Sequence, residues 1–358
     1  MGRFKRKEII RNSRSCVISA LSRRVCAGER RLSRAYGENK LNNQVSGEIN
    51  ARLKDAKKVV IASHVRPDGD AVGSLLAMGM ALMDAGKTVE MILADGVPSS
   101  FKFLEGGSLV KKEPEGGHDT FITVDCADFK RTGKVFENFG QPNINIDHHV
   151  TNENFGKLNL IEAEEVATAA ILTNHLPEWG YRITKPIAAA LLTGIVTDTL
   201  GFRTSNVTPE ALRQAALLME TGVDLPEIYM QSLVRKSYPA ARYWGAGLSS
   251  LESKNGIVWG TLTLADRKSA GYGGNDDADL INLISAIDGN KIGMVFVEQT
   301  NNHVKISWRA LVPGIDVSKV AKYFNGGGHA AAAGADIEGS LADIQKEALL
   351  KTRDLIGL

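Results

Sequence analysis

The sequence predicts an α/β protein in which a doubly wound, mostly parallel sheet forms the N-terminal domain and a smaller α/β domain follows. Short apolar runs alternate with helical periodicity in the first part of the chain, as in strand–helix–strand crossovers. A further strand, a helical pattern and a hairpin signal lie near the C-terminus. At 358 residues the chain has room for both domains.

The predicted elements of the N-terminal domain, residues 47–224, alternate in type along the chain. A helix over 46–57 comes first, followed by a strand over 59–63, a helix over 71–85, a strand over 88–94 and a small helix over 98–104. Strands over 119–128 and 143–146 come next. The last elements are helices over 166–180, over 184–197 and from Pro209, the last capped by Thr208. Parallel strands joined by such crossovers end at one common edge of the sheet, where ligands bind.

A linker or hinge is expected over residues 225–247, before a C-terminal domain over 248–358. Its predicted elements are a strand over 256–263, a helix over 277–287 and a hairpin of strands over 292–298 and 304–309. The turn of that hairpin is expected at Asn301 and Asn302.

Charge separates a basic leader from an acidic body. Residues 1–46 contain 12 Lys or Arg and 3 Glu, whereas residues 47–358 contain 31 Lys or Arg and 38 Asp or Glu. An Arg- and Ser-rich leader suits a transit peptide or a basic arm for nucleic acid, but without a foldable core a disordered tail or an upstream extension suits it better. The acidic body favours metal-assisted handling of a small anion over stable binding of duplex DNA.

Cysteine spacing and apolar content limit the cellular environments expected for this protein. The three cysteines Cys16, Cys26 and Cys126 form no C-x-x-C pair, which predicts a reducing cytoplasm and no disulfide framework. No apolar run approaches the roughly 20 residues that span a bilayer, so no membrane contact is expected.

The stretch His64-Val-Arg-Pro-Asp68-Gly-Asp70 follows the first strand. One imidazole nitrogen and two carboxylates within seven residues suit a divalent ion such as Mn²⁺ or Mg²⁺. An Asp-Gly turn with a capping Asp and a surface His explains the same residues equally well. Ligands elsewhere must decide between these two interpretations.

Three further groups follow the later elements. Asp125 comes at the end of a buried strand, where a capping or turn role is the alternative to metal binding. His148 and His149 follow the next strand, and strand alternation would turn one toward a metal and the other toward substrate, with Asp147 available to orient an imidazole. Asp198 ends an apolar helix, so it needs a metal or an Arg as partner.

The segment Gly326-Gly327-Gly328-His329, followed by an alanine run, predicts a loop that opens onto a helix N-terminus. Free amides there suit a phosphate, and a flexible surface loop is the alternative. Arg309, on the neighbouring predicted strand, supplies the cation that a phosphate site needs. Trp308 and Tyr272 could stack on a base, although a core or rim position is the better expectation for each.

The motifs H-x-x-x-D-x-D, V-D-x-x-D, D-H-H and G-I-V-T-D-T, in this order, resemble the DHH phosphoesterase family and its nano-RNase and pAp-phosphatase branch, from about residue 47 to the C-terminus. The resemblance implies two divalent ions, Mn²⁺ before Mg²⁺. His64, Asp68 and Asp125 would hold the first ion, and the second would lie between Asp70, Asp125, His148 and Asp198. Asp147 would orient a neighbour, although direct ligation stays open.

The resemblance also implies a reaction. A hydroxide between the two ions would attack phosphorus, while His149, Arg309 and His329 stabilise charge on the phosphoryl group and the glycine-rich segment Gly326–Gly328 binds the nucleotide. The expected substrates are short single-stranded oligoribonucleotides and 3′-phosphoadenosine 5′-phosphate (pAp), with a linear dinucleotide as a further option. The alternatives are a family II-like inorganic pyrophosphatase, a cyclic-dinucleotide-related phosphodiesterase and a non-catalytic nucleotide-binding regulator, and a homodimer is left open.

Overall fold

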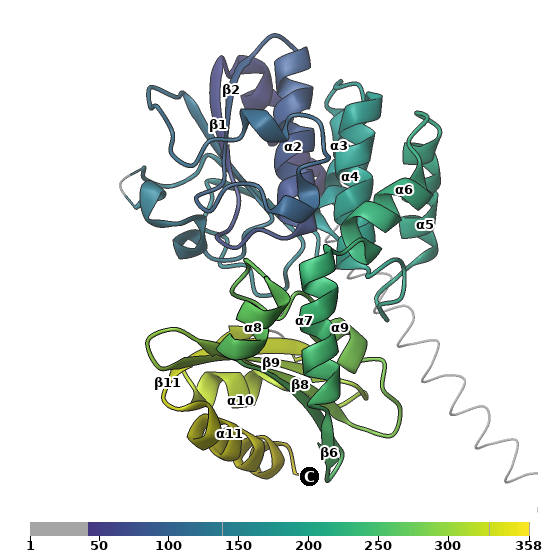
Figure 1. The fold of residues 1–358 in the computed structure, drawn as a ribbon. Coiled ribbons are helices and arrows are strands. Elements are labelled where there is room, and N and C mark those ends of the chain that lie inside the picture. Colours follow the sequence, from purple (N-terminus) through teal and green to yellow (C-terminus); the bar gives the residue numbers. More distant parts are fainter. Residues whose placement is uncertain (1–41, 138, 329, 358) are drawn as a thin grey trace, which may run out of the picture. The chain divides into compact units, whose positions relative to one another are not determined.

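The computed structural model describes residues 42–137, 139–328 and 330–357 (Figure 1). The chain divides into two units, the first ending at Arg235 and the second beginning at Lys236. The leader up to residue 41 and the predicted substrate residue His329 lie outside the described residues.

Unit 1 is built on a parallel sheet of five strands, which confirms the predicted fold class. The strands are β1 (Lys58–Ala62), β2 (Thr88–Ile92), β3 (Thr120–Val124), β4 (Ile144–Asp147) and β5 (Leu158–Ile161), in the order β2-β1-β3-β4-β5. Their carboxyl ends therefore lie along one edge of the sheet, as the placement of the polar motifs requires.

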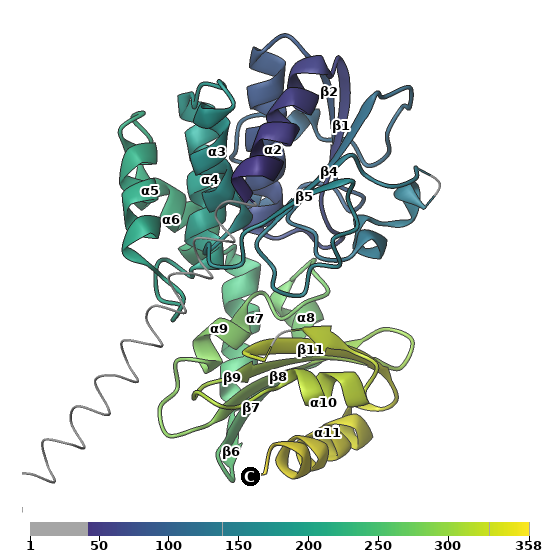
Figure 2. The same ribbon diagram turned by 180° about the vertical axis from the view of Figure 1, so that it is seen from behind.

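Long helices lie on one side of this sheet. They are a helix over residues 42–55, α2 (Gly69–Asp84), α3 (Thr168–Glu178), α4 (Lys185–Asp198) and α5 (Pro209–Met219). α2, α3 and α4 lie side by side (Figures 1 and 2) and share one apolar core with alternate strand residues such as Ile61 and Ile122. The hydrophobic face of each helix is thereby removed from water, which is the main favourable term in folding.

The other face carries a smaller aromatic cluster. Val60, Ala62 and Phe121 point to this side, where the short turns η3 (Phe129–Thr132) and η4 (Lys134–Phe136) cover them. Four further short elements of unit 1 are η1 (Ser99–Phe101), η2 (Gly107–Leu109), α6 (Leu225–Tyr229) and the π-helix η5 (Met230–Val234). The alternation of side chains between the two faces is the period of two that a strand imposes.

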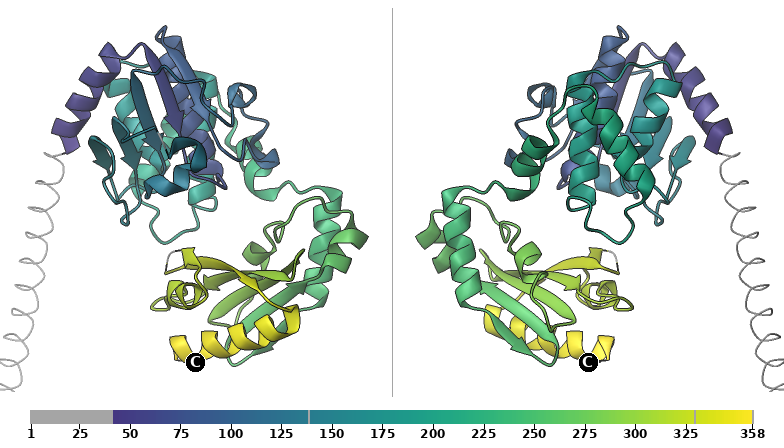
Figure 3. Two further views of the ribbon diagram at one scale, coloured as in Figure 1. Left: turned by 90° about the vertical axis from the view of Figure 1, so that its left-hand side faces the viewer. Right: turned by 90° about the vertical axis from the view of Figure 1, so that its right-hand side faces the viewer.

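The helix over 42–55 lies against the rest of unit 1 (Figure 3). Apolar and polar side-chain contacts hold it there. Ile49 and Leu53 are fully buried in the core. The Ser46 hydroxyl lies 3.0 Å from Nδ1 of His175 and accepts a hydrogen bond of 2.9 Å from the indole N–H of Trp179. These contacts hold the helix over 42–55 against the core of unit 1.

We expect Gly73→Ala to destabilise the protein by about 1–3 kcal/mol, because α2 and α4 pack without room for a side chain there. A Cβ at Gly73 would lie 2.3 Å from the carbonyl oxygen of Ala190 in α4. The control is Gly47→Ala in the helix over 42–55, where nothing lies within 4 Å and the higher helix propensity of alanine should stabilise. Urea denaturation of both variants tests this, and equal shifts of the same sign would contradict the packing argument.

Unit 2 contains a mixed sheet of six strands. They are β6 (Glu252–Lys254), β7 (Ile257–Leu262), β8 (Ile292–Gln299), β9 (His303–Ala310), β10 (Gly327–Gly328) and β11 (Ala332–Glu338), in the order β10-β11-β9-β8-β7-β6. β7 and β8 are parallel and the other pairs antiparallel. The predicted β8–β9 hairpin is confirmed, with Asn301 and Asn302 at φ values of 59° and 58°, as a tight turn between twisted strands requires.

Helices cover both faces of the second sheet. They are α7 (Tyr238–Ser249), α8 (Leu264–Ala270), α9 (Leu280–Ile284), α10 (Ser318–Tyr323) and α11 (Leu341–Ile356). α10 and α11 pack with one face, and α7 and α9 pack with the other (Figure 2). Tyr243 of α7 is fully buried in the second of these cores.

The structure corrects the prediction of a helix after the glycine-rich segment. Gly327 and Gly328 form β10, which pairs antiparallel with β11, so no helix N-terminus follows Gly326–Gly328. Alanine favours helices, but the backbone of Ala332 and Ala333 pairs with β9 instead, so tertiary pairing overrides propensity. The glycines fit this close pairing, because a Cβ at Gly326 would lie 2.2 Å from the carbonyl oxygen of Gly334.

None of the helices within the described ranges combines the length and apolarity needed to cross a membrane.

Candidate metal centre and active site

The carboxyl edge of the first sheet gathers the predicted ligands of unit 1. His64 follows β1, Asp125 follows β3, and His148 follows β4, while Asp198 ends α4. Nε2 of His64 lies 3.5 Å from Oδ2 of Asp125, and Nε2 of His148 lies 3.8 Å from Oδ1 of the same carboxylate. Asp125 therefore stands between two imidazoles, with one oxygen toward each.

Asp68 combines the two roles that the sequence left open. Its Oδ1 accepts hydrogen bonds from the backbone N–H groups of Asp70 and Ala71 and so caps α2. Its Oδ2 lies 3.7 Å from Nε2 of His64, and the side chain is 59% exposed. Capping with one oxygen thus leaves the other oxygen available as a ligand.

Asp70 is buried and joins two helices. Its Oδ2 accepts a hydrogen bond of 2.6 Å from the backbone N–H of Thr168, and its Oδ1 accepts one of 2.9 Å from Ala169. The N-cap residue of α3, Ala167, has no side-chain acceptor, so Asp70 serves as the cap of α3. This contact also places a negative charge at the positive end of that helix.

Thr168 links the two acids at the centre of the site, because its hydroxyl donates to Oδ1 of Asp125 over 3.2 Å. The role of Thr168 was not predicted, because nothing in the sequence around it distinguishes it from an ordinary helix start. Asp125 itself has a φ of 51°, a left-handed conformation that is uncommon for residues other than glycine. Strain of this kind persists where the surrounding structure imposes it, and it clusters at functional sites.

Among the described residues, the donor atoms form three groups in which all atoms lie within 4.8 Å of one another. These groups are His64, Asp68 and Asp125; Asp70, His148 and Asp198; and Asp125, His148 and His149. All six predicted metal ligands are among them. A set of imidazole nitrogens and carboxylate oxygens without thiolates fits Mn²⁺ or Mg²⁺.

The expectation that His148 and His149 point to opposite faces of a strand is wrong. β4 ends at Asp147, so the alternation of a strand no longer applies, and the two rings lie 4.4 Å apart with both near Asp125. Nδ1 of His148 lies 3.4 Å from the carbonyl oxygen of Glu165. The other ring nitrogen, Nε2, lies 3.4 Å from Oδ2 of Asp198.

Asp147 is fully buried and touches the histidines without lying in any of the three groups. Its Oδ1 accepts hydrogen bonds from the backbone N–H of His148 and from Nδ1 of His149, at 2.9 and 2.7 Å. Its Oδ2 accepts one of 2.6 Å from Nδ2 of Asn152. Both oxygens are thus engaged in orienting neighbours, as the resemblance implied.

Burial and neighbouring charges shift the pKa values of the clustered side chains. Burial, followed by the charges of Asp125 and Asp198, raises the pKa of Asp70 well above its ordinary value. Burial disfavours the His64 imidazolium, but hydrogen bonding to Asp125 and Asp68 outweighs burial and raises the pKa of His64 to about 10. Burial likewise opposes protonation of His149, but Asp147 and Asp125 raise its pKa to about 9.

The opposite applies to the central acid. Burial opposes ionisation of Asp125, yet the hydrogen bond and charge of His64, followed by His148 and His149, hold its pKa below the ordinary value. Burial and the charges of Asp125 and Asp68 raise the pKa of Asp198 well above the ordinary value. Protons thus neutralise charge that divalent cations would neutralise in the loaded site.

We therefore expect the affinity for Mn²⁺ to rise with pH. His64 with a pKa of about 10 holds its proton throughout the neutral range, and a cation must displace that proton to reach the nitrogen. Each displaced proton makes the apparent association constant about tenfold larger per pH unit. Calorimetric titration between pH 6 and pH 8 measures this, and an affinity independent of pH would contradict it.

Unit 2 holds the predicted substrate residues other than His329. Arg309 lies on β9, where it pairs with Ala332 of β11 close to Gly327 and Gly328. Its side chain is half-buried, and burial lowers its pKa while the charges of Asp277 and Asp279 oppose this. Arg309 and Gly326–Gly328 thus belong to one corner of the second sheet.

The two aromatic candidates have structural positions. Trp308 is fully buried, and its indole N–H donates to the hydroxyl of Thr352 over 3.0 Å. Tyr272 stacks on Tyr243 with ring centroids 5.1 Å apart and hydrogen-bonds Asp276. The core interpretation therefore holds for Trp308, and Tyr272 packs against the buried ring of Tyr243.

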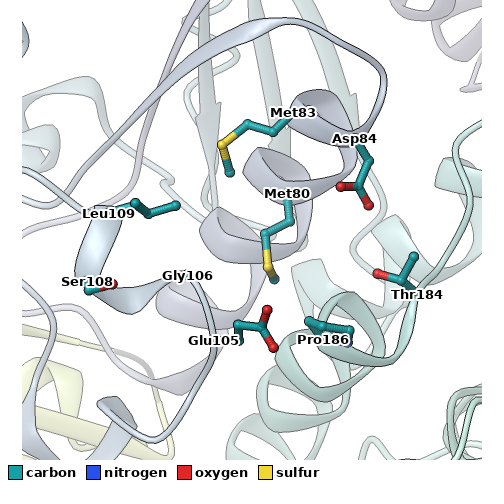
Figure 4. A pocket seen from close by; sticks show the side chains of 9 residues that line it. All are labelled: Met80, Met83, Asp84, Glu105, Gly106, Ser108, Leu109, Thr184 and Pro186. Carbon is teal, nitrogen blue, oxygen red and sulfur yellow. The ribbon is translucent and has the colours of Figure 1, made fainter.

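Other described residues of unit 1 line at least two hollows. One has a volume of about 340 Å³ and lies at the C-terminal end of α2, whereas Asp70 lies at the N-terminal end. Figure 4 shows Met80, Met83 and Asp84 of α2 around this hollow. The second, of about 420 Å³, lies at the amino ends of β3, β4 and β5 and is lined by His118 and Asn143 among others. Neither is lined by the three groups of donor atoms.

Comparisons with known proteins agree with this arrangement. A model of the DHH family, N-terminal domain, matches residues 58–195, and a model of the DHHA1 domain matches residues 264–355. The bifunctional oligoribonuclease and PAP phosphatase NrnA of Thermus thermophilus is 36% identical over 299 residues, covering 82% of this chain and 88% of the relative. The chain belongs to the DHH family. It is therefore a hydrolytic phosphoesterase, and the resemblance seen in its motifs is confirmed.

Two further comparisons extend over most of the chain. The protein of the same name from Bacillus subtilis is 24% identical over 295 residues, covering 78% of this chain and 89% of the relative. The crystal structure of an exopolyphosphatase-related protein from Bacteroides fragilis superposes with a TM-score of 0.81 and 26% identity, covering 88% of this chain and 98% of that one.

Proposed function

We propose that this enzyme hydrolyses short oligoribonucleotides and pAp with two divalent ions, Mn²⁺ in preference to Mg²⁺. The observation that carries the proposal is the position of Asp125, whose two oxygens face His64 and His148. Similarity to relatives named as oligoribonuclease and PAP phosphatase supports the choice of substrates. The acidic body, with little to hold a long polyanion, supports short substrates.

The residues fit the ions by chemistry. His64, Asp68 and Asp125 would hold one ion, and Asp70, Asp125, His148 and Asp198 the other. When bound, divalent ions lower the pKa of water and neutralise charge on a phosphoryl group. The chain itself supplies rigidity, because Asp68 and Asp70 are anchored by backbone N–H groups of α2 and α3.

Other side chains would act on the substrate. His149, held by Asp147, would donate a hydrogen bond to the phosphoryl group. Arg309, with the backbone of Gly326–Gly328 and His329, would bind the nucleotide portion of the substrate. The guanidinium suits this task, since it pairs with phosphate through two parallel hydrogen bonds. A homodimer and a cytoplasmic location remain predictions.

Turnover of four substrates by the purified chain tests the proposal. With Mn²⁺ present, we expect a dinucleotide and pAp to be cleaved much faster than pyrophosphate or a long single strand. Preference for pyrophosphate would favour the pyrophosphatase alternative instead, and absence of turnover on all four would favour a non-catalytic nucleotide binder.

A further inference from the structure

A series of hydrogen-bonded side chains leads from the interior of the first sheet to His149. The Thr123 hydroxyl donates to Oδ1 of Asn145 over 3.0 Å, and Nδ2 of Asn145 donates to Oδ1 of Asn152 over 3.0 Å. Nδ2 of Asn152 donates to Oδ2 of Asp147 over 2.6 Å, and Oδ1 of Asp147 receives Nδ1 of His149 at 2.7 Å. We call these five residues the donor series.

The direction in which the hydrogen bonds of the donor series run follows from the groups around Asn152. Oδ1 of Asn152 also accepts the backbone N–H of Asn154 at 2.7 Å, and its Nδ2 also donates to the carbonyl oxygen of Cys126 at 3.1 Å. A flipped amide would place N–H against N–H and oxygen against oxygen, so only one orientation of Asn152 satisfies its partners. Thr123 and Asn145 are fully buried, which makes an unsatisfied group there costly.

Every step of the series donates toward Asp147. That carboxylate also accepts the backbone N–H of His148, so it acts toward its neighbours as an acceptor only. The ring nitrogen beside it, Nδ1 of His149, must then be the one that carries a proton. Nδ1–H of His149 therefore faces Asp147 in both the neutral and the cationic ring.

We propose that Asn152 is a positioning residue that acts through Asp147 to hold His149 in the Nδ1–H tautomer and in one ring orientation. The assignment of a role to His149 rests on the proposed function, but the tautomer itself does not. Partners one step beyond the reacting groups commonly contribute about 10–100-fold to activity or metal affinity.

Asn152→Asp tests the proposal, because it keeps the shape and replaces the donor toward Asp147 by a second carboxylate. We expect kcat on a dinucleotide to fall about 10–100-fold with KM within about twofold, since the loss concerns orientation rather than binding. Long-range ¹H–¹⁵N NMR of the Mg²⁺-loaded protein without substrate, recorded at a pH where the ring of His149 is neutral, should show one Nδ1–H tautomer of His149 in the parent and a mixture in the variant.

The matched control is Asn159→Asp on the neighbouring strand β5. Asn159 exchanges hydrogen bonds with the backbone of Gly156 and lies outside the donor series, so the same change there should leave both kcat and the tautomer unchanged. Should Asn152→Asp not fold, Asn152→Ala takes its place with the same expectation.

A parent-like kcat or an unchanged tautomer in the Asn152 variant would overturn the proposal. Since the tautomer is measured without substrate, an inactive parent that still shows the Nδ1–H ring would count against the proposed function and not against the role of Asn152.

Discussion

Asp125→Asn should lower turnover of a dinucleotide by at least about 10³-fold, the largest effect expected of any single substitution in this protein. An asparagine side chain offers one oxygen as a metal ligand in place of two, and its NH₂ group does not coordinate cations. Because Oδ2 faces His64 and Oδ1 faces His148, the substitution affects both halves of the site at once. Steady-state turnover with saturating Mn²⁺ measures the loss.

Asp84→Asn is the matched control for this change. Asp84 ends α2, whose first turn contains Asp70, and it lies exposed beside the hollow of Figure 4. Both substitutions remove one negative charge from unit 1, so an effect of net charge alone would appear in both. Turnover of Asp125→Asn within tenfold of the Asp84→Asn protein would refute the central position given to Asp125.

Removal of divalent ions by a chelator should abolish turnover, and added Mn²⁺ should restore it. Without cations, burial and the negative charge of Asp125 disfavour the ionised forms of Asp70 and Asp198. Binding to the folded state alone stabilises a protein by about 2.7 kcal/mol at a ligand concentration of 100 times Kd. For a unit of this size that corresponds to a rise in Tm of roughly 5–10 °C.

Thermal unfolding with and without Mn²⁺ measures this stabilisation. The Asp125→Asn protein should show a much smaller rise in Tm, whereas the Asp84→Asn protein should respond like the parent. Full activity after exhaustive chelation, or an equal rise in all three proteins, would show that cations act elsewhere than at these residues.

The convergence of the candidate ligands could be predicted because their placement follows local rules. His64 and Asp125 follow buried strands, and parallel strands bring their carboxyl ends to one edge whatever the rest of the chain does. Residue type then restricts the chemistry, since imidazole and carboxylate groups without thiolates suit few ions. The structure adds the distances, and the comparisons add the family.

Contacts between distant segments could not be predicted in the same way. Asp70 caps α3 through the amides of Thr168 and Ala169, which lie 98 and 99 residues further along the chain. Backbone N–H groups carry no sequence signal, so no pattern of residue types announces such a cap. β5, over Leu158–Ile161, was missed for a related reason, because four residues with one asparagine are too few to show a period.

The alanine run after the glycines shows where propensity misleads. The side chains of Ala332 and Ala333 favour a helix, yet their backbone groups complete the ladder with Arg309 and Trp308 of β9. Strand pairing of this kind depends on the position of β9, which lies more than twenty residues earlier in the sequence. The histidine pair was misjudged for a simpler reason, since β4 ends one residue before His148.

The most direct test is anomalous diffraction at the manganese edge from crystals of the Mn²⁺-loaded protein. Two peaks, one beside His64 and one beside His148 with Asp125 touching both, are the result expected if these side chains form a two-metal centre. A single peak, or peaks remote from Asp125 in crystals of active protein, would contradict it.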